Sequence, residues 1–489
     1  MIGPVAAVVL LTALIGAAVA LGGAPAVRIQ DTGPAPTLSA FIGRAAVADP
    51  VPGVAGAWQD PFMAPDPLNS VHGDAWASDD YTSLSGPLGR HPQVLSTALG
   101  RDCITLTFDR KGRLIGTCSD LTHGPALYLL DPRTLATEAF MQLPYVAPPA
   151  GTDPATNTTG GAYFYLDNRD RVVLAASNQH ILVIELVDRR GVPRFQQVAQ
   201  YNPTPCLSPG DRIPSVLPDA QGRLWFVGRY QGAVGVLDPR TGRCRSVILH
   251  EQIENSFAVA SDGVYIVTDK AMYKFRAGSD LRPRLIWRMR YRNIGIQKIG
   301  QFNAGSGTTP TLVGPLGARP AAGWVAPAYV AITDNADPMD VVVYRTEDRL
   351  RRGDRRVVCQ VPVFRKGASD DENSLVSMGP SLIVENNYGY RLQDWNDVIA
   401  GGIRVGGNLG LVSAPGMDRI DIAANGSGCR IVWRNDQVRT PSAVTKGDTA
   451  NGLIYTYEHY AGIDLGMPPG GEPTLYLGGV GGIVALRDG

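Results

Sequence analysis

Short strand-like segments recur along this chain at a near-constant interval. The segment ALYLLDPRTL at 126–135 is echoed by ILVIELVDRRG at 181–191 and AVGVLDPRTG at 233–242, so equivalent positions lie about 53 residues apart. Each copy is a run of apolar and β-branched residues that ends at an Asp-Pro or Asp-Arg turn. A unit this short cannot bury both faces of its own sheet, so serial copies must pack against one another.

A second repeat places polar residues at the start of a strand. Glu254-Asn255-Ser256 and Glu372-Asn373-Ser374 each open an apolar strand, and a turn and a second strand follow. The segment TTPTLVG at 308–314, followed by YVAITDNADPMDVVVYR at 329–345, has the same order. About seven such units, without an amphipathic helix pattern, predict an all-β fold. We expect a single β-propeller of seven, or eight, four-stranded blades over residues 101–489, rather than a two-sheet sandwich.

Charge and motif content exclude several classes of protein. The 45 basic residues are balanced by 45 acidic ones, so the chain lacks the basic excess that nucleic-acid binding requires. The six histidines are isolated, without the spacing of a zinc site. A GxSxG nucleophile motif, a phosphate-binding loop and a dinucleotide fingerprint are all missing from the sequence. We therefore expect neither nucleotide chemistry nor an α/β-hydrolase.

The N-terminal segment has the character of an export signal. Residues 1–27 carry no charged side chain, and 5–21 form a continuous run of small apolar residues that ends in Ala-Val-Ala. This pattern predicts a signal peptide, or a membrane anchor if the segment is retained, although the basic residues that usually precede such a run are missing. A buried core helix is the alternative. Any contact with a membrane is expected through this segment alone.

Residues 28–100 differ in composition from the rest. Nine prolines fall between residues 30 and 100, and neither a strand nor a helix period is sustained. We interpret this region as a Pro/Gly-rich strap or linker, partly ordered against the propeller.

The six cysteines fit an oxidising compartment. Cys103 and Cys118 flank a polar turn whose centre lies midway between them, so a hairpin would place their sulfurs opposite each other and favour a disulfide. Two free buried thiols are the alternative. Order along the chain suggests the two remaining pairs, Cys206 with Cys244 and Cys359 with Cys429.

Polar residues at strand starts and ends are the candidates for ligand binding. In a propeller these positions converge from several blades on the mouth of the central channel. The candidates are Glu254, Asn255, Asp334, Asn335, Asp337, Glu372, Asn373, Glu385, Asn386, Asn387 and Lys446. Their oxygens suit a sugar-like polar ligand or calcium, the latter at Asp334, Asp337 and Glu385. Asp and Asn at strand ends also close turns through their own backbone, which is the structural alternative.

Two further possibilities follow from side-chain type. Paired carboxylates at the mouth could act as acid and base in glycoside cleavage, but the sequence identifies no catalytic residue. Arg288, Arg290 and Arg292 alternate with apolar residues and so share one face of a strand. That face could attract an anionic envelope polymer, or it could be a solvated outer edge that charge protects from pairing.

Four segments carry a resemblance to a known superfamily: GSGTTPTLVG, AITDNADPMDVVVYR, SLIVENNYGYR and PTLYLGGVGGIVALRDG. They resemble an exported bacterial branch of the quinoprotein-alcohol-dehydrogenase-like β-propellers, over most of the chain from about residue 79. The resemblance implies a propeller fold and export, but no catalytic role. Adjacent cysteines and a repeated tryptophan motif, typical of the quinone-using members, are missing, so we do not expect pyrroloquinoline quinone. The segment between Tyr460 and Pro468 is short for the branch, so the last blade could be incomplete, or closed by the strap.

The sequence therefore favours an exported β-propeller that binds a polar small molecule or an envelope or extracellular partner at an acidic, amide-rich mouth. A periplasmic dehydrogenase or hydrolase that uses the same carboxylates, and a scaffold without catalysis, are the alternatives.

Overall fold

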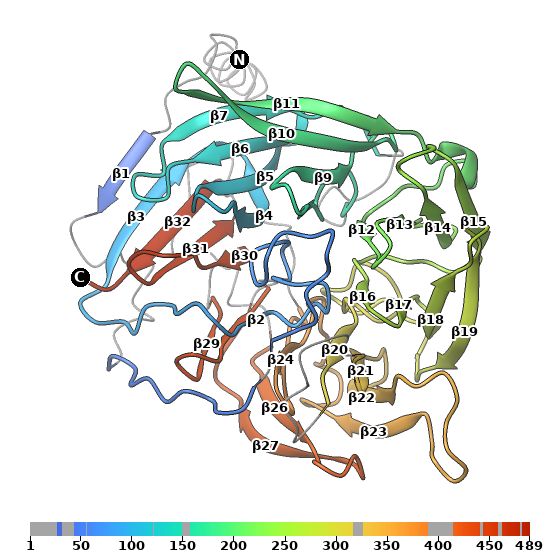
Figure 1. Ribbon diagram of the computed structural model, residues 1–489. Helices are drawn as coiled ribbons and strands as arrows, with labels where there is room; N and C mark the ends of the chain where they lie inside the picture. The colour runs from blue at the N-terminus through green and yellow to red at the C-terminus, as the bar shows by residue number, and fades with distance from the viewer. Residues whose placement is uncertain are drawn as a thin grey trace, which may run out of the picture.

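The chain forms a ring of β-sheets around a central axis (Figure 1). The computed structural model describes residues 27–31, 44–54, 56–120, 122–148, 157–315, 326–389, 414–440, 444–457, 462–479 and 482–489. Within these residues the strands make eight sheets, which are the blades of a β-propeller. The prediction of a propeller is confirmed, and the blade count is eight rather than seven. The predicted signal or anchor segment lies outside the described residues, apart from Val27.

Six blades have four antiparallel strands in sequence order from the axis outward. Blade 1 comprises β4 (Asp102–Phe108), β5 (Leu114–Asp120), β6 (Gly124–Leu130) and β7 (Thr137–Gln142). Blade 2 comprises β8 (Tyr165–Leu166), β9 (Val172–Ala175), β10 (Ile181–Arg189) and β11 (Val192–Tyr201). Blade 3 comprises β12 (Val216–Pro218), β13 (Leu224–Val227), β14 (Ala233–Leu237) and β15 (Cys244–Ile248), preceded by a 3-10 turn, η3 (Thr204–Cys206).

The next three blades follow the same plan. Blade 4 comprises β16 (Ala258–Ala260), β17 (Gly263–Val267), β18 (Ala271–Ala277) and β19 (Pro283–Arg290). Blade 5 comprises β20 (Thr311–Val313), β21 (Tyr329–Thr333), β22 (Asp340–Arg345) and β23 (Val357–Pro362). Blade 6 comprises β24 (Val376–Met378), β25 (Ser381–Glu385), β26 (Met417–Ile422) and β27 (Cys429–Asn435).

The last two blades depart from the four-stranded plan because N-terminal segments join them. Blade 7 has β28 (Lys446–Asp448) and β29 (Leu453–Tyr455), with β2 (Asp80–Tyr81) parallel to β28 on its axial side. Blade 8 has β30 (Gly462–Gly466), β31 (Thr474–Gly479) and β32 (Gly482–Arg487), followed by β3 (Gln93–Ala98) and β1 (Val27–Asp31). The β3–β32 pairing joins the two ends of the propeller and closes the ring.

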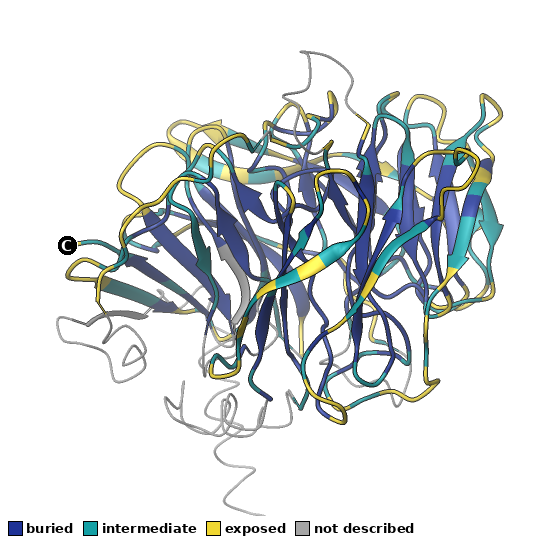
Figure 2. Ribbon diagram, turned by 90° about the horizontal axis from the view of Figure 1, so that it is seen from below, coloured by how far each residue is buried: buried dark blue, intermediate teal, exposed yellow. Residues whose placement is uncertain are grey.

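The sequence repeats map onto equivalent strands. The three echoes that end in Asp turns contain β6, β10 and β14, the third strands of blades 1, 2 and 3. Burial decreases outward: every residue of β13 and β14 is buried, whereas exposure alternates along β27. An inner strand is covered on both faces by neighbouring blades, so it is apolar throughout, whereas an outer strand keeps one wet face. Figure 2 shows this gradient from buried blade interiors to exposed edges.

An N-terminal strap, defined here as residues 44–92, passes through the centre of the ring (Figure 1). Its backbone carbonyls accept hydrogen bonds from the inner strands of blades 4, 5, 6 and 7 in turn, at Ala75, Trp76, Ser78 and Asp79. At the other end, Ala64 donates to Leu166 of blade 2. Residues 67–81 are all buried except Leu68, which is partly buried, so the strap fills the axis between the blades.

The strap also covers blade 7 on the outside, where the other blades have third and fourth strands. The Tyr455 hydroxyl donates to the Pro87 carbonyl at 2.9 Å, and Gly86 packs against the Tyr455 ring. The side chain of Asn451 donates to the Gly86 carbonyl at 3.2 Å.

All three expected disulfides are present. Cys103 and Cys118 are register partners in the β4–β5 hairpin, as the spacing predicted. Cys206–Cys244 ties the segment before blade 3 to its outer strand, and Cys359–Cys429 joins the outer strands of blades 5 and 6. No helix in the described part of the chain has the length and apolar character needed to cross a bilayer.

Candidate functional site

Polar residues from several blades gather at one end of the central axis, which we call the mouth. Glu254 and Asn255 precede the inner strand β16, and Glu372 and Asn373 precede β24. Glu385 ends β25. Because adjacent strands are antiparallel, a first strand begins at the same end of the blade where the second strand ends. These residues therefore share one end of the propeller.

Hydrogen bonds connect the mouth residues across blades 2, 4 and 5. The Tyr163 hydroxyl donates to Asn255 Oδ1 at 2.8 Å, and the Asn255 amide donates to the Gly307 carbonyl. An added Cβ at Gly307 would collide with the Glu372 carboxylate, so Glu372 packs directly on this glycine. Asn255 of blade 4 and Glu372 of blade 6 thus contact the same loop, which precedes blade 5.

The carboxylate of Glu254 is almost fully buried and has no hydrogen-bond partner among the described residues. The carboxylate of Glu372 is equally buried, and within those residues only the Phe302 backbone amide lies near enough to lower its pKa by hydrogen bonding, outside normal hydrogen-bond geometry. Glu254 is 3% exposed and Glu372 is 6% exposed. Burial raises the pKa of Glu254 to about 8; Arg229 lowers it and Asp370 raises it further. Burial, followed by the charges of Glu254 and Asp370, raises the pKa of Glu372 well above its usual value. Unpartnered buried polar groups are rare and need an explanation.

Three further acids of blade 6 surround Glu372. Burial raises the pKa of Asp370 to about 7, against the opposing effect of Lys298. Burial and the charge of Glu385 raise the pKa of Asp371 well above its ordinary value. Glu385 itself accepts hydrogen bonds from the side chains of Asn373 and Thr445, and burial raises its pKa to about 7.

Basic groups near these acids are fewer. The Arg229 guanidinium donates to Thr158 Oγ1 at 2.8 Å, and Thr158 Oγ1 donates to the Glu254 backbone carbonyl at 2.9 Å. The Lys298 ammonium donates to two backbone carbonyls, at 2.6 Å and 2.9 Å. Burial lowers the pKa of Lys298, although Asp370 and Asp334 raise it. Within the described part of the chain, two cationic side chains, those of Arg229 and Lys298, act on the five acids Glu254, Asp370, Asp371, Glu372 and Glu385.

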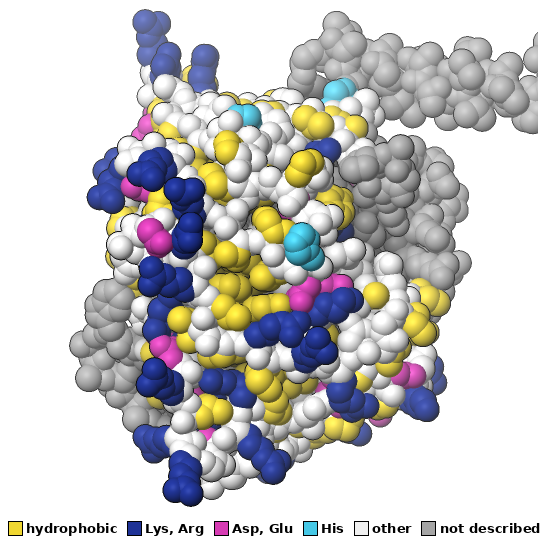
Figure 3. All heavy atoms as spheres, turned by 90° about the vertical axis from the view of Figure 1, so that its right-hand side faces the viewer, with side chains coloured by type: hydrophobic (Ala, Val, Ile, Leu, Met, Phe, Trp, Pro, Cys, Tyr) yellow, Lys and Arg dark blue, Asp and Glu magenta, His cyan; other side chains and the backbone are white. Residues whose placement is uncertain are grey.

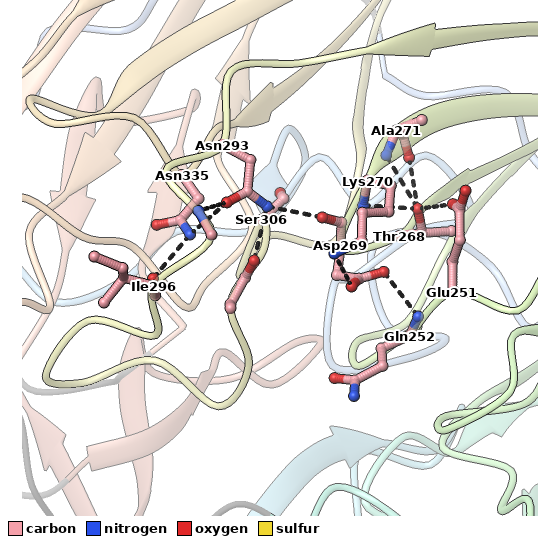
Figure 4. Close-up of polar contacts among 12 residues, drawn as sticks. Glu251, Gln252, Thr268, Asp269, Lys270, Ala271, Asn293, Ile296, Ser306 and Asn335 are labelled. Atoms are coloured by element: carbon pink, nitrogen blue, oxygen red, sulfur yellow. Dashed lines mark hydrogen bonds and ion pairs between the residues drawn. The ribbon is translucent and has the colours of Figure 1, made fainter.

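The polar side chains of the loop that follows β21 bind groups of that loop and of its neighbours. Asp334 Oδ1 accepts hydrogen bonds from the backbone amides of Ala336 and Asp340, at 3.0 Å and 2.9 Å. Asp337 accepts from the Gly367 amide. Asn335 donates to Asn293 and to the Ile296 carbonyl, so it bridges two loops of blades 4 and 5 (Figure 4). The Asp334 contacts are the turn chemistry that the sequence allowed as an alternative, whereas Asp337 and Asn335 bind neighbouring loops.

The other predicted residues lie below or beside the carboxylates. Asn387 Oδ1 accepts from the Glu372 amide at 2.8 Å, and Asn386 Oδ1 accepts from the Asp370 amide at 3.2 Å, so both amides fix the acidic loop. Lys446 donates to Asp79 Oδ1 at 2.5 Å. Its ammonium therefore binds the strap.

The strap forms the floor of the mouth. His72 Nδ1 lies 3.1 Å from Asp79 Oδ2 and 3.0 Å from Ser374 Oγ. Because both neighbours contact the same ring nitrogen, the arrangement differs from a relay in which serine and aspartate bind opposite nitrogens. His72 Nε2 is buried without a partner among the described residues.

Metal binding at the mouth stays a prediction. Within the ranges described, no group of three His, Cys, Asp or Glu side chains is arranged to hold a metal ion. Asp334 and Asp337 contact backbone amides of separate loops, and Glu385 contacts blade 7 and Asn373 instead.

Sequence reasoning missed six mouth residues. Asp370 and Asp371 adjoin the recognised Glu372 and could have been included on that ground. Thr158 lies in the loop that precedes β8 of blade 2, where no repeat in the sequence marks it. Tyr163, Arg229 and Lys298 carry no local signal, because only the ring brings their loops to the same place.

No protein-family model matches the chain. An uncharacterised protein of Archaeoglobus fulgidus is 26% identical over 429 residues, which cover 81% of this chain and 78% of that protein. A catalytically inactive variant of virginiamycin B lyase from Staphylococcus aureus, solved with quinupristin, covers 81% of this chain and 99% of its own, with 10% identity and a TM-score of 0.41. The Pan2 WD40 domain of Neurospora crassa covers 79% of this chain and 89% of its own, with 12% identity and a TM-score of 0.37. These structures are similar in fold alone.

Proposed function

We propose that the protein binds a polar ligand at the mouth through the carboxylates of Glu254 and Glu372. The observation that carries this proposal is that, among the described residues, the buried Glu254 carboxylate has no hydrogen-bond partner and the buried Glu372 carboxylate has only the Phe302 backbone amide beside it. A ligand that donates hydrogen bonds would satisfy them. Since five acids face two bases, a ligand that also brings positive charge is favoured, and the low exposure admits only a small group. We therefore assign the ligand to organic amines, with the ammonium between Glu254 and Glu372.

We further propose that the protein acts outside the cytoplasm. The three disulfides are typical of an oxidising compartment. The apolar run at 5–21 would direct export, as a cleaved signal peptide or as a retained anchor. The ligand would then come from the cell envelope or the extracellular medium. Membership of the quinoprotein-like branch is part of the same proposal and is supported by the four sequence segments quoted above.

Calorimetric titration tests the ligand assignment. Spermidine is the amine probe, calcium chloride the metal probe and maltotetraose the neutral polyol probe, each at pH 7 and 0.15 M NaCl. We expect spermidine to bind, to release protons because an ammonium lowers the raised carboxyl pKa values, and to lose at least tenfold in affinity in E254Q/E372Q. The matched control is E185Q, because Glu185 lies exposed on β10.

Three results would overturn this assignment. Spermidine binding that E254Q/E372Q leaves intact would place the amine elsewhere. Failure of spermidine to bind would refute the assignment to organic amines. Binding of maltotetraose or calcium in place of spermidine would identify a polyol or a metal ion as the ligand class of the mouth. Repeating the titration in buffers of different ionisation enthalpy separates the heat of proton release from the heat of binding.

An acid–base enzyme is the second candidate, favoured by the raised pKa of Glu254 and Glu385. Values of about 8 and about 7 keep these carboxyls partly protonated near neutral pH, as a general acid requires. An enzyme would lose turnover by orders of magnitude in E254Q while it still bound its substrate, whereas a binding protein would lose affinity alone.

A further inference from the structure

A groove between the outer edges of blades 3 and 4 is lined by arginines. Four of its side chains are Arg243 and Arg245 on one wall and Arg282 and Arg284 on the other. Arg243 precedes β15 and Arg282 precedes β19, and each second arginine lies two residues further along. Figure 3, which views this side of the ring, shows basic side chains spread over the surface and fewer acidic ones between them.

The positive charge of this groove is only weakly compensated. The one acidic residue among its lining residues is Asp280, which lies 4.0 Å from Arg282 and 3.6 Å from Arg284. These are exposed pairs, since the arginine side chains are 70% and 64% exposed, and such pairs contribute little. Arg243 and Arg245 are exposed and form no ion pair within the described ranges. Four cations therefore face one carboxylate.

The arrangement suits an extended anion better than a small one. Residues two apart on an extended chain are separated by about 6.6 Å, so each wall presents two guanidinium groups in a row. A guanidinium binds carboxylate, sulfate or phosphate oxygens through two parallel hydrogen bonds. A small anion can use one such group, whereas a linear polymer with repeated negative groups can use all four at once.

The disulfide Cys206–Cys244 borders the same groove. Disulfides form and persist in oxidising compartments. The choice of a glycan over a nucleic acid as the polyanion rests on the location outside the cytoplasm proposed above. The neighbouring basic strip differs from this groove. Arg288 and Arg292 form ion pairs with Glu251 and Asp340, at 2.8 Å each, so within the described ranges Arg290 is the exposed arginine of that strip without an ion pair.

We propose that this groove binds an anionic polysaccharide that bears carboxylate or sulfate groups. The site lies on the outer edge of the ring and does not depend on the ligand proposed for the mouth.

The test uses heparin as the sulfated probe and polygalacturonate as the carboxylated probe, with neutral dextran as a control, by calorimetry at 0.15 M NaCl. We expect the wild-type protein to bind at least one anionic probe and R243E/R245E to lose at least tenfold in affinity. The matched control R190E/R194E changes the same charge on the exposed β10–β11 hairpin of blade 2, and we expect less than a twofold loss.

A second measurement does not depend on a variant that folds. Arginine modification with p-hydroxyphenylglyoxal, read by mass spectrometry, should show Arg243, Arg245, Arg282 and Arg284 protected in the wild-type protein by the bound probe. Equal losses in the two variants, no binding of either anionic probe, or tighter binding of single-stranded DNA would each overturn the proposal. Heparin affinity should be unchanged in E254Q/E372Q, which separates failure here from failure at the mouth.

Discussion

The ion pair between Asp79 and Lys446 tests how far the strap holds the ring together. Lys446 Nζ lies 2.5 Å from Asp79 Oδ1, and both side chains have 0% exposure. Replacing Asp79 by Asn keeps the shape but leaves a buried ammonium without its carboxylate. Removing one partner of a buried pair costs about 3–5 kcal/mol, so we expect D79N to lower the free energy of unfolding by that amount.

The pH dependence of stability provides an independent measure of the same pair. Burial alone would raise the pKa of Asp79, but Lys446 and His72 together lower it from 3.8 to about 2. A folded-state pKa below the unfolded value stabilises the protein above about pH 4, and this contribution is lost as the pH falls through 2. The difference corresponds to about 2 kcal/mol. In D79N this part of the acid dependence should disappear.

Urea unfolding, followed by circular dichroism and tryptophan fluorescence between pH 2 and pH 7, measures both effects. The control is D188N, which breaks the pair with Lys111, where the side chains are 47% and 67% exposed. We expect a cost below about 1 kcal/mol there. D79N/K446M should cost less than the sum of the single variants, because neither charge is left alone. Additive costs, or a D79N protein within 1 kcal/mol of wild type, would refute the reasoning.

Three further outcomes follow from the structure. Burial raises the pKa of Glu254 to about 8, so its contribution to stability is present below about pH 4.5 and is lost as the pH rises through 8. The melting temperature of E254Q should therefore exceed that of the wild type at pH 8.5 and equal it at pH 4.5. Equal melting temperatures at both pH values would contradict this prediction. The disulfide of Cys103 and Cys118 closes a loop with a sequence separation of 15, so C103A/C118A should lower the free energy of unfolding in urea by about 3 kcal/mol. An unchanged free energy would show that the disulfide does not stabilise the hairpin. An added methyl at Gly235 would collide with the Phe226 ring, so G235A should lower the free energy of unfolding by about 1–3 kcal/mol. The control is G428A, because no atom of the described residues lies within 4 Å of a methyl added there. Equal losses in the two variants would count against the packing argument.

Local pattern was sufficient for the blades. The echoes at 126–135, 181–191 and 233–242 are equivalent strands because each blade solves the same packing problem with the same apolar run and Asp turn. The Cys103–Cys118 bond followed from hairpin register, which is a local property. Blade count was harder, because blade 7 has two strands of its own and borrows a third from the strap, so the repeat in the sequence is incomplete there.

The candidate site was predictable only in part. Glu254 and Glu372 were identified because both precede an inner strand in the same Glu-Asn-Ser context. Asp334 and Asn335 also place a carboxylate next to an amide, but these side chains bind groups of their own loop and of a neighbouring one. No single-sequence pattern separates these two outcomes, because the difference lies in which backbone amides the folded loops bring within reach.

The sequence alone determined the β-strand units, their serial packing, the hairpin disulfide and the near-neutral charge that argues against nucleic acid. Only the tertiary structure decided that residues 67–81 occupy the ring axis, that Lys446 is bound to Asp79 of that strap, and that buried acids from blades 4 and 6 lie together at the mouth. The physical reason is how far apart in the sequence the interacting residues lie. Strand period and turn chemistry depend on residues a few positions apart, whereas burial, charge coupling and the axial contacts depend on loops that closure of the ring brings together.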